Sequence, residues 1–182
     1  MDCAFQHAAL AWARTMTPSS RKAHLLDMLR AELTRELEAA RQRAQDAAAH
    51  ATHEENRPEN DKDMRSTEAS YIARGQADRV REIAHALAQL STIPVRDLEK
   101  GEAIVVSAIV TVRHEASETT YFVVPAAGGA RLRDDVGEVQ TLATTSPLGA
   151  ALLGLSEGDE AEATMPHGRT RITRTFEIVH VS

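Results

Sequence analysis

The chain has 182 residues, of which 42% are hydrophobic but only 3% aromatic, and its formal net charge is -6. So few aromatic residues argue against one large core and favour a thin, elongated part held together by leucine and alanine. An acidic chain also lacks the positive field with which free nucleic-acid binders attract phosphates. Protein contacts are therefore expected to dominate over autonomous binding of DNA or RNA.

The start of the chain carries the one cysteine, Cys3, which excludes an intramolecular disulfide and fits a reducing cytoplasm. No apolar run approaches the roughly 20 residues that span a bilayer, and the weakly apolar first residues lack a basic leader. We therefore expect a cytoplasmic protein without a signal peptide or membrane contact. Residues 1–17 are expected to be an N-terminal extension of no assigned function, with Met16 as an alternative start.

Helix-forming Ala, Glu, Arg, Leu and Gln dominate residues 18–92, which predicts two long helices. The first is expected to begin at Ser19 or Ser20. Its apolar residues recur every three or four positions and form one stripe: Leu26, Leu29, Leu33, Leu37, Ala40, Ala44, Ala47 and Ala51. The second is expected to begin near Ser66 or Thr67. Its stripe comprises Ala69, Ile72, Ala73, Ala77, Val80, Ile83, Leu87 and Leu90.

The two stripes taper in opposite directions, from leucine to alanine and from alanine to leucine. Their bulky ends and their slender ends meet only if the helices pair antiparallel. We therefore expect a coiled-coil hairpin over residues 18–92, with two helices of a larger bundle as the alternative.

The segment 53–65 joins the helices as a polar, acidic tip, with Pro58 as the breaker. Its charged residues are Glu54, Glu55, Arg57, Glu59, Asp61, Lys62, Asp63 and Arg65. An acidic tip of this kind is either a solvated turn or a group that contacts a metal ion.

From residue 93 onward β-branched residues alternate with polar ones, and Gly and Pro become frequent, so a second domain is expected over 93–182. The expected strands are Glu102–Val112, Thr119–Val124, Arg131–Arg133, Val139–Ala143, Glu160–Met165 and Thr170–Val181. A short helix is expected over Ser146–Leu153, with Pro147 in its first turn and Gly154 at its end. An antiparallel sheet with one short helix follows from this pattern.

The run Ser146 to Gly154 (SPLGAALLG), followed by Glu157-Gly158-Asp159-Glu160, resembles the C-terminal domain of the GreA/GreB transcription elongation factors. The closing FEIVHV at Phe176 to Val181 fits as well, and the resemblance covers about residues 93–182. It implies an FKBP-like fold. The whole chain is then an α+β protein, with an N-terminal antiparallel coiled-coil hairpin followed by an FKBP-like antiparallel β domain with one short helix.

The hairpin is similar to that of the same family in its layout and its acidic tip. Gre factors carry a tip of the type Asp-x-x-Glu-Asn-Ala-Glu-Tyr, and alignment on Tyr71 places Met64 and Thr67 where the two tip acids fall. The acids that stand nearby are Asp61, Asp63 and Glu68.

The resemblance implies an accessory factor of RNA polymerase rather than an enzyme. Its tip would enter the secondary channel and share a Mg²⁺ ion with the polymerase active site, which cleaves backtracked RNA. Asp61 and Asp63 are the expected catalytic and metal-contacting residues, with Glu59 and Glu68 as further metal contacts. The expected polymerase-binding residues are Ser146, Pro147, Leu148, Gly149, Gly158 and Asp159.

The expected partner is RNA polymerase, with nascent RNA met only inside the elongation complex, and a monomer is expected. Two other functions remain open: a regulator that occupies the channel without stimulating cleavage, and a structural coiled-coil adaptor. Tyr71 is expected to pack across the alanine-rich tip, with a contact near the polymerase active site as the alternative. An FKBP-like fold also raises prolyl isomerisation, but that activity needs an aromatic-lined pocket, and the domain offers only Tyr121, Phe122 and Phe176.

Overall fold

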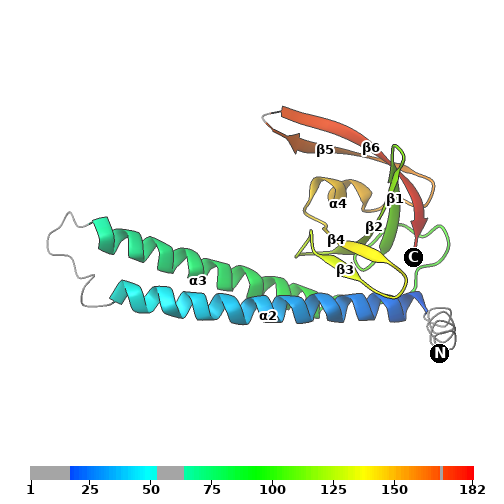
Figure 1. Ribbon diagram of the computed structural model, residues 1–182. Coiled ribbons are helices and arrows are strands. Elements are labelled where there is room, and N and C mark those ends of the chain that lie inside the picture. The colour runs from blue at the N-terminus through cyan, green and yellow to red at the C-terminus, as the bar shows by residue number, and fades with distance from the viewer. Residues whose placement is uncertain (1–16, 53–63, 169) are drawn as a thin grey trace, which may run out of the picture. The chain divides into compact units, whose positions relative to one another are not determined.

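The computed structural model describes residues 17–52, 64–168 and 170–182 (Figure 1). They form two compact units, one of residues 30–88 and one of the described residues up to Leu29 together with Gln89–Ser182. The predicted N-terminal extension, apart from Thr17, and the predicted tip acids Glu59, Asp61 and Asp63 lie outside the described residues. Among the described residues, no helix combines the length and apolar character that crossing a membrane requires.

Two long helices, α2 (Pro18–Thr52) and α3 (Met64–Ser91), form the predicted hairpin (Figure 1). The predicted stripe of α2 is confirmed, since its leucines and Ala40 are buried and its last three alanines are half-buried. An ion pair between Arg79 of α3 and Glu36 of α2 joins the two helices within the 30–88 unit. Toward the tip of the hairpin the stripe of α2 consists of alanines, and their small side chains let the two helix backbones approach closely.

The stripe of α3 differs from the prediction at two positions. Ile72 is 54% exposed and Ala77 is also exposed, whereas Gln76 is half-buried. Ala86 and Gln89 near the base are half-buried, and the remaining buried or half-buried residues from Ala69 onward step alternately by four and three positions: Ala69, Ala73, Gln76, Val80, Ile83, Leu87 and Leu90. This is the 3.5-residue repeat of a coiled coil, and position within it outweighs the apolar character of Ile72.

A six-stranded sheet in the order β3-β4-β2-β1-β6-β5 forms the second domain. Its strands are β1 (Ile109–His114), β2 (Ser117–Val124), β3 (Arg131–Arg133), β4 (Glu138–Ala143), β5 (Glu160–His167) and β6 (Thr170–Val181). Four neighbouring pairs are antiparallel, as predicted, but β2 and β4 run parallel, so the sheet is mixed. After β2 the chain forms the edge strand β3 and then turns back into β4. Strand β4 therefore lies between β3 and β2 and runs in the same direction as β2.

The segment before β1 corrects the prediction of one long strand over Glu102–Val112. Residues 102–108 are irregular, and the strand begins at Ile109. Ser107 adopts a left-handed backbone with φ 75°, and its hydroxyl donates to the carbonyl of Pro94 at 2.8 Å. β-branched composition alone does not reveal such a turn, which ties the start of the sheet to the segment that follows α3.

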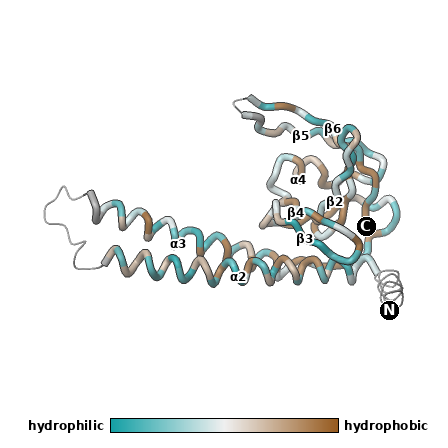
Figure 2. The backbone as a smooth tube through the Cα atoms, in the orientation of Figure 1, coloured by the Kyte–Doolittle hydropathy of each residue, from teal (hydrophilic) through white to brown (hydrophobic). Residues whose placement is uncertain are grey.

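The predicted short helix forms as α4 (Pro147–Leu152), and it lies against the sheet and closes its core. Hydrophobic residues run through β1, β2 and β4 (Figure 2). The core unites residues from most of the strands with two leucines of α4 and two residues of the irregular segment before β1: Ile104, Ala108, Val110, Val112, Val123, Leu142, Leu148, Leu152, Ala161, Ala163, Phe176 and Ile178. Each Å² of apolar surface removed from water stabilises a fold by about 25 cal/mol, so burial of these side chains stabilises the domain.

Candidate functional site

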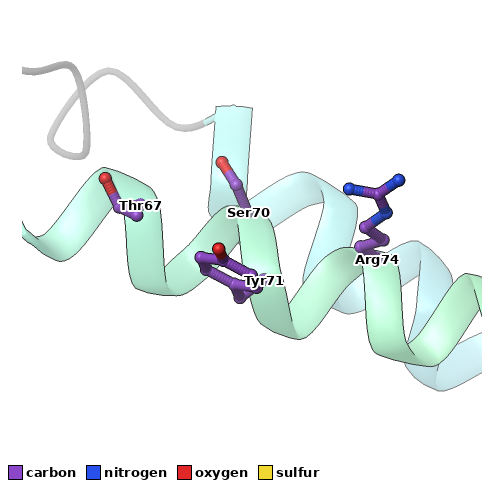
Figure 3. A pocket seen from close by; sticks show the side chains of 4 residues that line it. All are labelled: Thr67, Ser70, Tyr71 and Arg74. Atoms are coloured by element: carbon purple, nitrogen blue, oxygen red, sulfur yellow. The ribbon is translucent and has the colours of Figure 1, made fainter.

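A shallow groove lies on the part of α3 nearest the tip, lined by Thr67, Ser70, Tyr71 and Arg74 (Figure 3). Tyr71 is 71% exposed, so the expectation that it packs across the tip is wrong. The 3.5-residue repeat explains why: Ala69 and Ala73 occupy the seam, and Tyr71 lies midway between them on the outer surface. An exposed ring beside a guanidinium is suited to contact with another molecule.

A second groove lies on the same end of the hairpin, between the two helices. It is lined by Arg43, Asp46, Ala47, His50, Ala69, Ile72 and Gln76. Tyr71 and Ile72 are both more than half exposed, and each lines a different one of the two grooves, since neighbouring residues of a helix point about 100° apart. Each groove therefore carries one large exposed apolar side chain near the tip end of the hairpin.

Glu68 is the one predicted metal contact inside the described residues, and it lies exposed in the second turn of α3. Within the described parts of the chain, no three residues of the His, Cys, Asp and Glu types come together as a metal site. The roles predicted for Glu59, Asp61, Asp63 and Glu68 stay predictions.

Ser146, which the expected helix included, instead precedes α4 and caps it, and the residues around it fix the start of the helix. The Ser146 hydroxyl accepts the amide N–H of Gly149 at 3.0 Å and donates to the carbonyl of Ala143 at 2.7 Å. A Cβ atom on Gly149 would lie 2.0 Å from that same carbonyl oxygen. The motif therefore requires Gly149 because the helix start and the end of β4 approach too closely for any side chain.

The other predicted polymerase-binding residues divide by exposure. Leu148 is 6% exposed and belongs to the core, while Pro147 is exposed. Gly158 has φ 94°, and the Asp159 carboxylate accepts the amide N–H of Ser156 at 2.8 Å, so both build the turn before β5. Pro147 and Asp159 are thus exposed, whereas Leu148 and Gly149 are buried and shape the helix. Their role in binding polymerase stays a prediction.

Buried polar residues at the start of α2 form a group that sequence reasoning missed. The Arg21 guanidinium donates to both carboxylate oxygens of Asp134, at 2.7 and 3.3 Å, and the Asp134 side chain is 4% exposed. Oδ1 of Asp134 also accepts the amide N–H groups of Val136 and Gly137, each at 2.9 Å. Burial raises the pKa of Asp134, but the Arg21 hydrogen bond and these two amides outweigh it, so the pKa is lowered overall.

Lys22, the next residue, is fully buried. Its ammonium group donates to the carbonyl of Arg96 at 2.8 Å. Burial lowers the pKa of Lys22, and nearby Asp97 opposes that shift. Asp97 in turn accepts the backbone N–H of Ser19. The first turn of α2 and the segment after α3 are therefore joined by two polar contacts, of which the one from Lys22 is partly buried.

Arg96 and Glu102 form a further ion pair in the same segment. The Glu102 carboxylate also accepts the amide N–H of Glu99 at 3.0 Å. The hydrogen bond from Arg96 and then this amide lower the pKa of Glu102 to about 2. No local pattern announces the pairing of Arg21 with Asp134, which are 113 positions apart. Only correlated changes among related sequences would have signalled it.

The aromatic residues of the sheet domain form no open pocket for a prolyl substrate. Phe122 and Phe176 are 0% and 6% exposed, and both lie within the packed interior. Tyr121 is half-buried against the core. The grooves described above instead lie on the hairpin.

Comparison with known proteins identifies the family. The chain is 31% identical over 159 residues to the transcription elongation factor GreA of Methylococcus capsulatus, covering 85% of this chain and 91% of the relative. This chain belongs to the GreA/GreB family. The family model described as "Transcription elongation factor, GreA/GreB, C-term" matches residues 99–182. Since 159 aligned residues exceed that range, the hairpin of this GreA/GreB protein takes part in the match.

Solved structures of the family were also found. The GreA factor homolog 1 protein of Thermus thermophilus is 21% identical, with a TM-score of 0.33, and the match covers 84% of this chain and 94% of that one. A GreA/GreB elongation factor from Nitrosomonas europaea is 24% identical, with a TM-score of 0.34, and the match covers 55% and 78%. Superpositions this loose carry no argument, and membership of the GreA/GreB family rests on the sequence match to the relative.

Proposed function

We propose that this chain acts on RNA polymerase as an accessory factor that inserts its hairpin tip into the secondary channel and stimulates cleavage of backtracked RNA. In this proposal the chain is not itself an enzyme, because the cleaved bond lies in the active site of the polymerase. It meets nascent RNA only inside the elongation complex. Membership of the GreA/GreB family, through a match that extends into the hairpin, is the observation that carries the proposal.

The chemistry of the tip supports a role beside a metal ion. Carboxylates are the hard oxygen ligands that Mg²⁺ prefers, and the ion is usually held by one or two of them together with water and phosphate. The exposed carboxylate of Glu68 fits such a group, and Asp61, Asp63 and Glu59 would complete it. A second Mg²⁺ of the polymerase active site would supply the activated water. The protein's part is to present these carboxylates on a slender stem.

The two grooves near the tip support docking on a protein wall. Tyr71 and Ile72 expose apolar surface, and Arg74 and Arg43 place positive charge beside it. Aromatic and arginine side chains are the residues most often found at binding hot spots. An acidic, partly apolar channel wall would complement them.

Cleavage of RNA in stalled, backtracked elongation complexes tests the proposal. We expect the wild-type chain to accelerate cleavage in Mg²⁺, and the Asp61→Ala/Asp63→Ala variant to lose most of that effect while still binding polymerase. Glu54→Ala/Glu55→Ala is the matched control, since it removes two tip acids outside the expected metal group. Cleavage no faster than with polymerase alone would refute the proposal.

A regulator that occupies the channel without stimulating cleavage is the second candidate. It is favoured by Thr67, a neutral residue that lies exposed in the groove of Tyr71, where the family pattern aligned on Tyr71 places an acid. This candidate predicts slower RNA extension at saturating protein, with no cleavage, and no effect of Asp61→Ala/Asp63→Ala. A structural adaptor would neither bind polymerase nor alter either reaction.

A further inference from the structure

We propose that the Arg21–Asp134 ion pair is a positioning contact for the tip: it fixes the first turns of α2 to the β3–β4 turn, and the stimulated cleavage depends on that fixation. The inference rests on the proposed function for its cleavage readout. Arg21 and Asp134 touch neither RNA nor metal in this scheme and act only through the helix that Arg21 belongs to.

The geometry of the contact is that of a rigid joint. A bidentate guanidinium–carboxylate pair fixes both distance and direction, which a single contact between point charges does not. Asp134 is itself held by the amides of Val136 and Gly137, so its carboxylate cannot turn away. Because the Asp134 side chain is only 4% exposed, water competes little for the pair.

A second anchor lies one residue further along α2. Lys22 is fully buried and donates to the carbonyl of Arg96, while Asp97 accepts the backbone N–H of Ser19. Arg21 and Lys22, two neighbouring residues of one helical turn, are thus held by two different segments, the β3–β4 turn and the irregular connection after α3. A helix held by two segments at its first turns resists both tilting and rotation about its own axis.

The length of α2 makes this joint consequential. The helix continues without a break for 35 residues, which corresponds to about 50 Å. At that length a tilt of about 5° at one end displaces the other end by about 4 Å. Groups that take part in chemistry must be placed to about 0.5 Å, and an error of about 1 Å can cost about 100-fold in rate. A loose base would therefore scatter the tip acids by far more than the reaction tolerates.

The test separates positioning from binding and from folding. Asp134→Asn keeps an oxygen that accepts the amides of Val136 and Gly137 but removes the charged pair, and Arg21→Gln removes it from the other side. Arg21→Lys is the conservative variant. Arg113→Gln is the matched control, because Arg113 pairs with Glu118 and Glu177 on the sheet, away from α2.

For each variant, the maximal rate of stimulated cleavage and the half-saturating concentration are measured on backtracked complexes, after circular dichroism has confirmed folding. We expect Asp134→Asn and Arg21→Gln to lower the maximal rate by about 10-fold or more, with half-saturation changed by less than about 3-fold. Arg21→Lys should recover part of the rate, and Arg113→Gln should match wild type. Unchanged maximal rates, or a loss confined to half-saturation, would overturn the inference.

Hydrogen exchange distinguishes failure of this inference from failure of the proposed function. If the wild-type chain stimulates no cleavage, the proposed function fails, but the joint remains testable in the protein alone. We expect Arg21→Gln to increase amide exchange in residues 18–29 and 131–137 together, while residues 160–181 keep wild-type exchange. Faster exchange in only one of the first two segments, or in neither, would show that the pair does not join them.

Discussion

At the scale of single residues, two glycines of this chain meet opposite surroundings. Gly149 starts α4 so close to Ala143 that an added Cβ would overlap its carbonyl oxygen, whereas an added Cβ on Gly75 would meet nothing within 4 Å. Gly75 lies inside α3, where its flexibility costs helix stability and no steric demand requires it. The same substitution at the two positions must therefore have opposite effects.

Gly149→Ala is expected to destabilise the fold by about 2 kcal/mol or more, because α4 or the end of β4 must shift to admit the methyl group. Gly75→Ala is expected to stabilise it by about 0.5–1 kcal/mol through helix propensity. Urea denaturation followed by circular dichroism measures both. Equal effects of the same sign would show that the close approach at Gly149 does not exist in solution.

Glu102 gives the chain a defined response to acid. Its pKa is lowered from 4.5 to about 2 in the folded protein, chiefly by the hydrogen bond from Arg96. A lowered pKa means that the stabilisation is present above pH 4.5 and is lost as the pH falls toward 2. The urea midpoint of wild type should therefore exceed that of Glu102→Gln near neutral pH, and the difference should shrink across this window. A difference that stays constant across the window would contradict the assignment.

At the scale of elements, the 3.5-residue repeat of α3 decides which apolar side chains contribute to stability. Ile83 is 3% exposed in the seam, whereas Ile72 is 54% exposed outside it. Ile83→Ala is expected to cost about 2–4 kcal/mol, and Ile72→Ala less than about 0.5 kcal/mol. Thermal or urea denaturation of the two variants measures this contrast. Similar losses of unfolding free energy in the two variants would instead support the predicted stripe, in which both isoleucines lie on one face of the helix.

The elements themselves follow well from sequence because their signals are local. The stripe of α2, the strands from β2 onward and the cap at Ser146 are each set by residues within a few positions of one another. The left-handed turn at Ser107 and the parallel pairing of β2 with β4 depend on distant segments, and composition does not encode them. The candidate site could be predicted only in part for the same reason. The sequence shows that a tyrosine lies near the tip, but the exposure of Tyr71 depends on how the two helices are paired.

At the scale of the whole molecule, the division into two units falls within both long helices and not at the end of the hairpin. Residues up to Leu29 and from Gln89 onward belong to the unit of the sheet. Leu25, Leu26, Leu29 and Leu90 are at most 2% exposed there. The base of the hairpin thus belongs to the same compact unit as the sheet.

Excision of residues 30–88, with Leu29 joined to Gln89 by a short glycine–serine linker, is therefore expected to leave a folded protein. A cooperative thermal transition and dispersed amide resonances would establish this. The matched fragment that begins at residue 93 lacks the helical base, exposes the surface it covers, and is expected to melt at a lower temperature. A shortened chain without a cooperative transition would show that the sheet unit needs the full hairpin.

The coiled-coil repeat also limits how a hairpin of this kind can change in length. Each residue inserted into a helix turns everything beyond it by about 100°, so one or two extra residues would point the following side chains in a different direction. Seven residues make two turns and restore the original seam, provided that the opposite helix lengthens by the same amount. The hairpin can therefore lengthen or shorten in steps of about 10 Å, one heptad in each helix at a time. Relatives whose hairpins differ in length should differ by whole heptads in both helices.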